Sequence, residues 1–183
     1  MQVESLAIPE VKILTPKKFG DHRGFFAETY SRQKLAEAGI DAEFVQDNQS
    51  LSATVGTLRG LHYQLPPFSQ AKLVRVLRGA ILDVAVDVRR GSPTFGQFVA
   101  AELSADNFKM IYVPVGFAHG FETLTPDAEI AYKVTNYYAP AHERGIRWND
   151  PALAIPWRVR EADAVLSAKD KITPLLSKAT DLL

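Results

Sequence analysis

The sequence predicts an all-β protein built as an antiparallel sandwich or barrel, with a few short helices at its periphery. Between residues 44 and 138 the apolar side chains recur at a period of two, in short runs rich in β-branched and aromatic residues. These runs follow one another at intervals of roughly 10–15 residues, with turn signals between them and no helical pattern. Strands in such a succession pair as antiparallel neighbours, because the short connections leave no room for a crossover helix.

The amino-terminal part precedes this strand region. Residues 11–14 form a short apolar run, which we interpret as an edge strand. Gly20 and Gly24 bracket a turn that holds Arg23 at its tip. The clearest helix follows at residues 31–38, between a serine suited to cap its first turn and a glycine that stops it.

The strand region divides at its turn signals. The predicted strands span residues 73–77, 81–88, 95–103, 110–113 and 128–135. In the second of them one face is apolar and the other carries Asp83 and Asp87, which is consistent with a lumen that holds polar groups. From Pro140 onward the composition favours short helical or irregular segments. Because no repeat, low-complexity tract or linker interrupts the chain, we expect one domain over residues 1–183.

Composition narrows the classes of function. The 21 basic and 21 acidic residues cancel, which argues against an electrostatic nucleic-acid binder. The absence of cysteine removes disulfides, thiolate nucleophiles and cysteine-based metal sites. No apolar run reaches the roughly 18 residues of a membrane span, and residues 1–12 lack the core of a signal peptide. We therefore expect a cytoplasmic enzyme with no membrane partner.

Two of the four histidines stand out as candidates for acid–base chemistry. His62 and His119 each lie among glycines and aromatic residues, and a neutral imidazole accepts a proton near pH 7. Metal binding is the rival use, but two histidines rarely hold a catalytic metal, which usually has three protein ligands. Arg59 and Arg23 are candidate phosphate anchors. Strict alternation would turn Arg59 and His62 to opposite faces, unless Gly60 hosts a bulge.

Several other side chains have both a structural and a chemical interpretation. Lys72 begins an apolar strand, where it is either solvated or a lumenal cation for an enolate or a phosphate. Asp83 is either an outward, solvated carboxylate or a partner that orients Lys72. Tyr132 is either a core aromatic residue or a phenol that delivers a proton. One of Tyr137 and Tyr138 could stack on a planar base.

Nine stretches, in this order, carry a family resemblance. They are Arg23-Gly24-Phe25-Phe26 with Glu28, Gln46-Asp47-Asn48-Gln49-Ser50, Leu58-Arg59-Gly60-Leu61-His62-Tyr63-Gln64, Lys72-Leu73-Val74-Arg75-Val76, Gly116-Phe117-Ala118-His119-Gly120-Phe121, Tyr132-Lys133-Val134-Thr135, Tyr138, Trp148-Asn149-Asp150-Pro151 and Ser167-Ala168-Lys169-Asp170. Over nearly its whole length the chain resembles the dTDP-4-dehydrorhamnose 3,5-epimerase family, whose members are cupins. The resemblance implies a cupin-type jelly roll and an isomerase that needs no metal and no other cofactor. Gln64 stands where a metal-binding cupin would carry its second histidine.

The resemblance also implies roles for individual residues. His62 would be the general base, oriented by Asp170, and Tyr132 would be the acid on the opposite face of the sugar. Lys72 and His119 would stabilise an enolate at the keto oxygen. The implied contacts to the thymidine diphosphate portion are Arg23, Glu28, Gln46, Asp47, Asn48, Arg59, Tyr138 and Glu143, with Phe26 as a packing surface and Lys169 as a weaker candidate.

The implied reaction is epimerisation at carbons 3 and 5 of dTDP-4-dehydro-6-deoxy-D-glucose, giving dTDP-4-dehydro-L-rhamnose on the route to cell-surface polysaccharide. The implied partners are the dTDP-sugar and a second copy of the chain. In some relatives the pocket combines residues from both chains of a homodimer, and exchange of the amino-terminal segment is one route to this. Three alternatives stand beside this hypothesis: inversion of a single centre in another deoxysugar pathway, a metal-dependent cupin oxygenase, and a cupin that binds the sugar nucleotide without catalysis.

Overall fold

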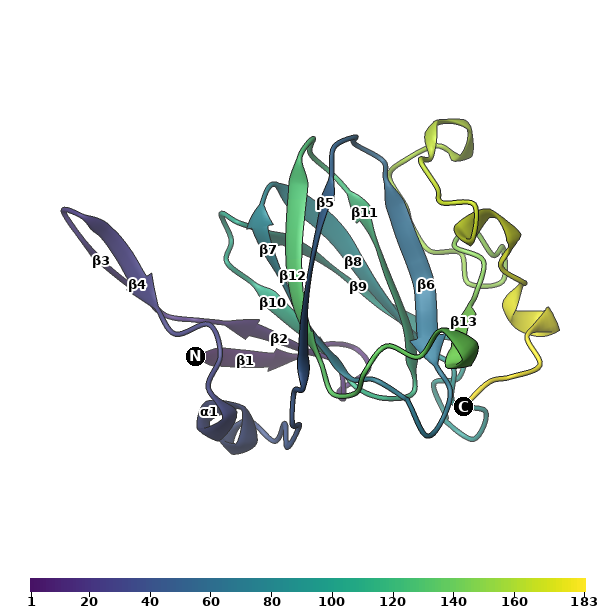
Figure 1. The fold of residues 1–183 in the computed structure, drawn as a ribbon, viewed down its shortest axis with the longest axis horizontal. Coiled ribbons are helices and arrows are strands. Elements are labelled where there is room, and N and C mark those ends of the chain that lie inside the picture. The colour runs from purple at the N-terminus through teal and green to yellow at the C-terminus, as the bar shows by residue number, and fades with distance from the viewer.

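A computed structural model describes residues 1–183 and shows two antiparallel sheets that face each other (Figure 1). One sheet has six strands in the order β1-β2-β10-β7-β12-β5, and the other has five in the order β13-β6-β11-β8-β9. The predicted all-β class is therefore confirmed. The strands of the two sheets are β1 (Gln2–Ser5), β2 (Lys12–Thr15), β5 (Gln46–Ser52), β6 (Leu58–Gln64), β7 (Lys72–Arg78), β8 (Ala80–Asp87), β9 (Phe98–Ser104), β10 (Met110–Val113), β11 (Phe117–Thr123), β12 (Ala128–Val134) and β13 (Glu143–Gly145).

A separate hairpin, here called the arm, consists of β3 (Lys18–Asp21) and β4 (Gly24–Ala27). Figure 1 shows the arm projecting away from the two sheets, on the side opposite the carboxyl terminus. The turn of the arm holds Arg23 between the two strands, as the glycines predicted. Phe19, Phe25 and Phe26 are 52%, 58% and 66% exposed, although the ring of Phe25 meets that of Phe108 edge-on, so most of the apolar surface of the arm is uncovered in a single chain.

The main core lies between the two sheets. Val74 and Ile130 from the six-stranded sheet meet Ile81 and Phe121 from the five-stranded one. A second apolar layer covers the outer face of the five-stranded sheet, where the carboxyl-terminal segment packs on β8 and β6. Strand β8 is consequently buried on both faces, which explains why it reads as apolar over nearly its whole length.

The predicted edge strand at residues 11–14 is wrong in its position within the sheet. Strand β2 is an interior strand, paired with β10 on one side and with β1 on the other. The edge belongs to β1, whose short and largely polar sequence gave no strand signal. Ile13 and Leu14 are both buried, and an edge position would have left them less covered.

The helical elements are few and peripheral, as predicted. Helix α1 (Arg32–Glu37) begins after Ser31, whose hydroxyl accepts a hydrogen bond from the backbone N–H of Lys34. Gly39 ends it with a φ of 78°. The other helical turns are η1 (Pro140–His142), η2 (Glu161–Asp163), η3 (Asp170–Ile172) and η4 (Leu176–Lys178). No helix has the length and apolar character that a membrane crossing requires.

Candidate active site

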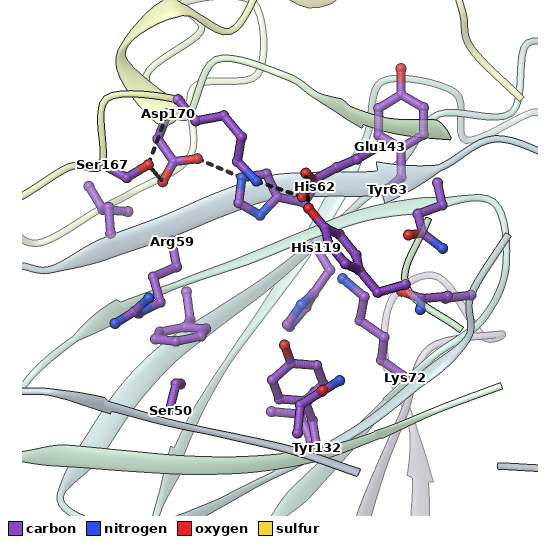
Figure 2. Close-up of a pocket in the computed structure, with 18 of the residues that line it drawn as sticks. Ser50, Arg59, His62, Tyr63, Lys72, His119, Tyr132, Glu143, Ser167 and Asp170 are labelled. Atoms are coloured by element: carbon purple, nitrogen blue, oxygen red, sulfur yellow. Dashed lines mark hydrogen bonds and ion pairs between the residues drawn. The ribbon is translucent and has the colours of Figure 1, made fainter. Parts of the chain in front are cut away.

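One cavity of about 790 Å³ opens between the two sheets. Strand β6 forms one wall, β12 and β5 form the opposite wall, and the segment around η3 closes one side (Figure 2). A cavity of this volume suits a small organic ligand. Its lining brings together nearly all of the residues that the sequence singled out within the barrel, namely Gln46, Asn48, Arg59, His62, Lys72, His119, Tyr132, Tyr138, Glu143, Lys169 and Asp170.

The first functional feature is a histidine–carboxylate pair on the β6 wall. The Nε2 of His62 lies 2.5 Å from Oδ1 of Asp170, which the carboxyl-terminal segment brings across 108 residues of sequence. A carboxylate only accepts hydrogen bonds, so Nε2 carries the proton and Nδ1 keeps its lone pair. Burial alone would raise the pKa of Asp170, but hydrogen bonds from His62 and from the Ser167 hydroxyl outweigh it and lower that pKa. His62 can therefore act as a base through Nδ1, while ionised Asp170 fixes the orientation of its ring.

A bulge in β6 explains how Arg59 and His62 both line the cavity. His62 pairs with His119, and Arg59 pairs with Phe121, so three residue steps in β6 lie opposite two in β11. Gly60 has a φ of 131°, and a Cβ atom there would lie 2.6 Å from Cα of Gly120. Of the two possibilities that the sequence left open, strict alternation or a bulge at Gly60, the structure has the bulge. Only glycine tolerates this conformation and this close approach.

A second histidine–carboxylate pair lies deeper in the cavity. The Nε2 of His119 is 2.9 Å from both carboxylate oxygens of Asp83, and Asp83 is 0% exposed. The outward, solvated interpretation of Asp83 is thus wrong, and its hydrogen-bonded partner is His119 rather than Lys72. Burial lowers the pKa of His119, against the opposing attraction of Asp83. A neutral His119 donates from Nε2 to Asp83 and offers only a lone pair at Nδ1.

Lys72 supplies a cation beside this second pair. It begins β7 and lines the cavity, so the lumenal interpretation describes its position. Burial lowers the pKa of Lys72 to about 8, while the negative charges of Asp83 and Glu143 act in the opposite direction. Below that pH the side chain is a poorly solvated ammonium, which favours a developing negative charge nearby.

Tyr132 faces the cavity from the wall opposite His62. It lies in β12, and Figure 2 shows its hydroxyl pointing into the space on whose other side His62 lies. Burial raises the pKa of Tyr132, and the positive charge of Arg59 only partly offsets this. The phenol therefore stays protonated at neutral pH and can donate a proton.

A polar cluster surrounds the mouth of the cavity. Glu143 accepts hydrogen bonds from the Tyr138 hydroxyl at 2.9 Å and from Nζ of Lys169 at 2.6 Å. Burial would raise the pKa of Glu143, but these two donors lower it. On β5, Gln46 donates to Asn48 at 2.8 Å, and both line the cavity because alternation turns them inward. Tyr138 belongs to the lining and Tyr137 does not.

Four predicted contact residues lie outside the cavity of their own chain. Arg23 and Phe26 are on the arm, where the Arg23 side chain is 78% exposed and pairs with Asp21. Glu28 pairs with Lys34 near α1. Asp47 alternates with its inward neighbours, so its side chain turns to the outer face of the sheet and pairs with Lys133 at 2.8 Å. Their roles as contacts to the substrate stay predictions, because none of the four lines the cavity of its own chain.

The structure adds residues that sequence reasoning missed. Ser50 lines the cavity with a buried hydroxyl that has no hydrogen-bond partner, and the period-two alternation from Gln46 and Asn48 could have found it. Ser167 holds Asp170, and Gln64 is 4% exposed beside the mouth. Both stand inside stretches that carried the resemblance, but nothing local predicted their partners. No three histidine, aspartate or glutamate side chains converge in the way that a metal ion would need.

Known proteins are similar to this chain in sequence and in fold. A family model described as dTDP-4-dehydrorhamnose 3,5-epimerase matches residues 5–178. A protein of that name from Sinorhizobium fredii is 53% identical over 176 residues, which cover 96% of this chain and 90% of the relative. The crystal structure of a dTDP-6-deoxy-D-glucose-3,5-epimerase from Legionella pneumophila, in complex with dTDP-4-keto-L-rhamnose, matches with a TM-score of 0.92 and 48% identity, covering 97% of this chain and 93% of that one. An epimerase from Bacillus anthracis with TDP and PPi bound matches with the same TM-score and 50% identity, covering 95% of this chain and 98% of that one.

Proposed function

The chain belongs to the dTDP-4-dehydrorhamnose 3,5-epimerase family of isomerases, and from that premise we propose that it inverts carbons 3 and 5 of dTDP-4-dehydro-6-deoxy-D-glucose. The product is dTDP-4-dehydro-L-rhamnose. The observation that carries the proposal is that His62 and Tyr132, from two different sheets, line one cavity that also holds the Lys72 cation. A base and an acid on opposed walls are what the inversion of a carbon centre requires, because the proton leaves from one face and returns to the other.

The first step is proton abstraction next to the ketone. The carbonyl at carbon 4 acidifies the hydrogens on carbons 3 and 5, and Nδ1 of His62 accepts one of them. The imidazolium that forms is stabilised by Asp170, which already holds Nε2 at 2.5 Å. The electron pair of the broken C–H bond moves to the carbonyl oxygen as an enolate, and the Lys72 ammonium stabilises that charge.

The second step returns a proton to the opposite face of the sugar. Tyr132 donates its phenolic proton to carbon, the enolate collapses to the ketone, and the centre is inverted. Solvent then restores the proton of Tyr132 and accepts that of His62, whose side chain is 23% exposed. No step requires an oxidant or a reductant, and the protons removed and returned are accounted for by His62, Tyr132 and solvent.

Binding of the nucleotide falls to the residues at the mouth. Arg59 presents a guanidinium, which suits two phosphate oxygens. Tyr138 is the aromatic ring of the lining that can stack on the thymine base. Gln46, Asn48, Glu143 and Lys169 supply hydrogen bonds and charge around these two.

The test is incubation with dTDP-4-dehydro-6-deoxy-D-glucose in deuterated water. We expect label at both carbons 3 and 5, read by NMR and mass spectrometry. Label at a single carbon would assign the chain to single-centre inversion instead. Absence of label at both carbons, with dTDP still bound, would reduce it to a sugar-nucleotide-binding protein.

We also propose that the working unit is a homodimer in the cytoplasm. The arm supports this, since three exposed phenylalanines and Arg23 lie on it and far from the chain's own cavity. A second copy that accepts the arm would bury that apolar surface and bring Arg23 and Phe26 toward a phosphate site.

Mixing two inactive variants tests this assembly. Arg23→Ala and His62→Ala are each expected to lose activity, and co-refolded mixtures should regain roughly a quarter of it, because half of the molecules are heterodimers with one intact site. Recovery occurs only when Arg23 and His62 of one site come from different chains. A mixture that stays inactive, although native mass spectrometry detects heterodimers, would show that the arm serves its own chain.

A further inference from the structure

The side-chain amide of Gln64 uses both of its donor hydrogens and its acceptor within one small region. Nε2 donates to the carbonyl of Phe68 at 2.6 Å and to that of Tyr137 at 3.2 Å. Oε1 accepts from the backbone N–H of Ala139 at 2.8 Å. The side chain lies on β6, two residues after His62, and is 4% exposed. A buried amide with every donor used is a fixed structural element.

Two of these three bonds flank Tyr138 directly. The carbonyl before Tyr138 and the N–H after it are both held by Gln64, so the backbone is clamped on either side of the ring. This part of the chain lies outside the strands and helices, between β12 and η1. Its own ladder of hydrogen bonds is therefore missing, and side-chain amides replace it.

Two further glutamines support the same segment, but less directly. Nε2 of Gln70 donates to the carbonyl of Asn136 at 2.7 Å. Oε1 of Gln46 accepts from the N–H of Tyr138 at 3.4 Å, which is near the limit for a hydrogen bond. Tyr138 is 54% exposed, and the only hydrogen bond that its side chain makes to the protein is the one to Glu143. The position of the ring thus depends on the backbone beneath it.

We propose that Gln64 is a positioning residue that presents the ring of Tyr138 to the planar base of the nucleotide. The inference rests on the proposed function, in which Tyr138 stacks on that base, and adds the residue that makes stacking possible. Position 64 is the place where a metal-binding cupin would carry a histidine. In this chain the amide at that position serves the nucleotide end of the cavity and supplies no ligand to a metal.

The first measurement is dTDP affinity by calorimetry for Gln64→Met, which keeps the length of the side chain and removes all three hydrogen bonds. We expect dTDP to bind about tenfold more weakly, as for the loss of a stacking contact. In turnover, KM should rise by a similar factor while kcat stays within about twofold. If Gln64 had a merely structural role, Gln64→Met would lower the stability of the fold without raising KM selectively over kcat.

A double-mutant cycle with Tyr138→Ala identifies the route of the effect. If Gln64 acts through the ring, Gln64→Met should change dTDP affinity by less than about twofold in the Tyr138→Ala background. An equal loss in both backgrounds would overturn the proposal, and so would unchanged affinity in Gln64→Met alone. Gln64→Glu keeps the acceptor for Ala139 but sets a carboxylate against two carbonyls, and it replaces Gln64→Met in the cycle if the latter does not fold.

Thr125→Val is the matched control. It removes a hydrogen bond to a backbone N–H, that of Ala80 at 3.0 Å, in a turn that contributes nothing to the cavity. This variant should be destabilised and yet bind dTDP as the unaltered chain does. If the unaltered chain does not bind dTDP, the proposed function fails. If it binds and the cycle is additive, only the role of Gln64 fails.

Discussion

The cavity contains two histidine–carboxylate pairs that are alike in chemistry and different in surroundings. His62 and His119 lie directly opposite each other on β6 and β11. Each directs Nε2 to an aspartate, at 2.5 Å in the first pair and 2.9 Å in the second. The side chain of His62 is 23% exposed, whereas that of His119 is 8% exposed and its partner Asp83 is 0% exposed.

This difference in burial gives the two rings different tasks. Burial lowers the pKa of His119, so that ring stays neutral and contributes a fixed lone pair. His62 reaches solvent, and its carboxylate partner is held ionised by Ser167 and by the ring itself. Proton exchange needs contact with water, and the side chain of His62 is exposed to 23% against 8% for His119. The same two residue types thus form an exchanging base in one place and a fixed polar contact in the other.

Replacing each histidine by asparagine is the strongest way to break this comparison. His62→Asn removes the base, and we expect kcat to fall by roughly 10²–10⁴-fold. His119→Asn removes a buried polar contact, and we expect kcat to fall by about tenfold, which corresponds to the free energy of one hydrogen bond. Deuterium incorporation at carbons 3 and 5 should slow by the same large factor in the first variant and by much less in the second. A greater loss of exchange in His119→Asn would reverse the assignment of the base.

The two aspartates should separate activity from stability. Asp170→Ala leaves Nε2 of His62 without its acceptor, but the side chain of His62 is 23% exposed and can turn to water. We therefore expect roughly a 10²-fold loss of kcat and a smaller loss of unfolding free energy than in Asp83→Ala. Asp83→Ala leaves Nε2 of His119 buried without an acceptor, and we expect the free energy of unfolding to fall by about 1–3 kcal/mol. Urea denaturation measures the second quantity and steady-state kinetics the first. Equal stability losses in the two variants would contradict the idea that the difference in exposure between His62 and His119 decides the cost of an unpaired Nε2.

The sequence could predict the faces of the strands but not the partners across them. Alternation in β8 separates Asp83 from the apolar face without deciding between lumen and solvent, and Gly60 is the residue of β6 that can host a bulge. Neither pattern states which strand lies alongside, so the sequence offers Lys72 as a possible partner of Asp83 and gives no indication of His119. His119 is 36 residues away from Asp83 in sequence, and only the register of β8 with β11 brings them together.

The carboxyl-terminal segment and the arm show a second limit. The segment that carries Asp170 has little regular structure, and the apolar contacts of Leu176 and Leu182 with the outer face of the five-stranded sheet set its path. Such packing leaves no periodic pattern in the sequence. The pairing of His62 with Asp170 is therefore predicted by the family resemblance alone. The hairpin of the arm follows from Gly20 and Gly24, but local turn chemistry does not determine what the arm packs against.

The pH dependence of catalysis sharpens the comparison around the buried pair. Lys72 must be protonated to stabilise the enolate, and its pKa is about 8 because burial disfavours the ammonium. Activity should therefore fall as pH rises through about 8. Asp83 raises the pKa of Lys72, so Asp83→Asn, which removes the charge, should move this alkaline limb to lower pH.

The profile of kcat against pH measures this shift, and Glu102→Gln serves as control. Glu102 is an exposed carboxylate on β9 that pairs with Arg158 and does not line the cavity. Its removal should leave the alkaline limb in place. A limb that does not move in Asp83→Asn would mean that a group other than Lys72 titrates there.

Replacing Ser167 gives the smallest predicted effect. It tests the His62–Asp170 pair through the residue that holds the carboxylate of Asp170. Its hydroxyl donates to Oδ2 of Asp170 at 2.8 Å and accepts from the backbone N–H of the same residue at 3.1 Å. Ser167→Ala removes one of the bonds that keep Asp170 ionised, so the pKa of Asp170 should rise and its hold on His62 weaken. We expect kcat to fall by roughly 3–10-fold, the range of a single hydrogen bond, with KM nearly unchanged. Ser167→Thr retains the hydroxyl and should restore most of the activity, whereas a threonine variant as slow as the alanine one would show that side-chain volume, and not this hydrogen bond, sets the position of Asp170.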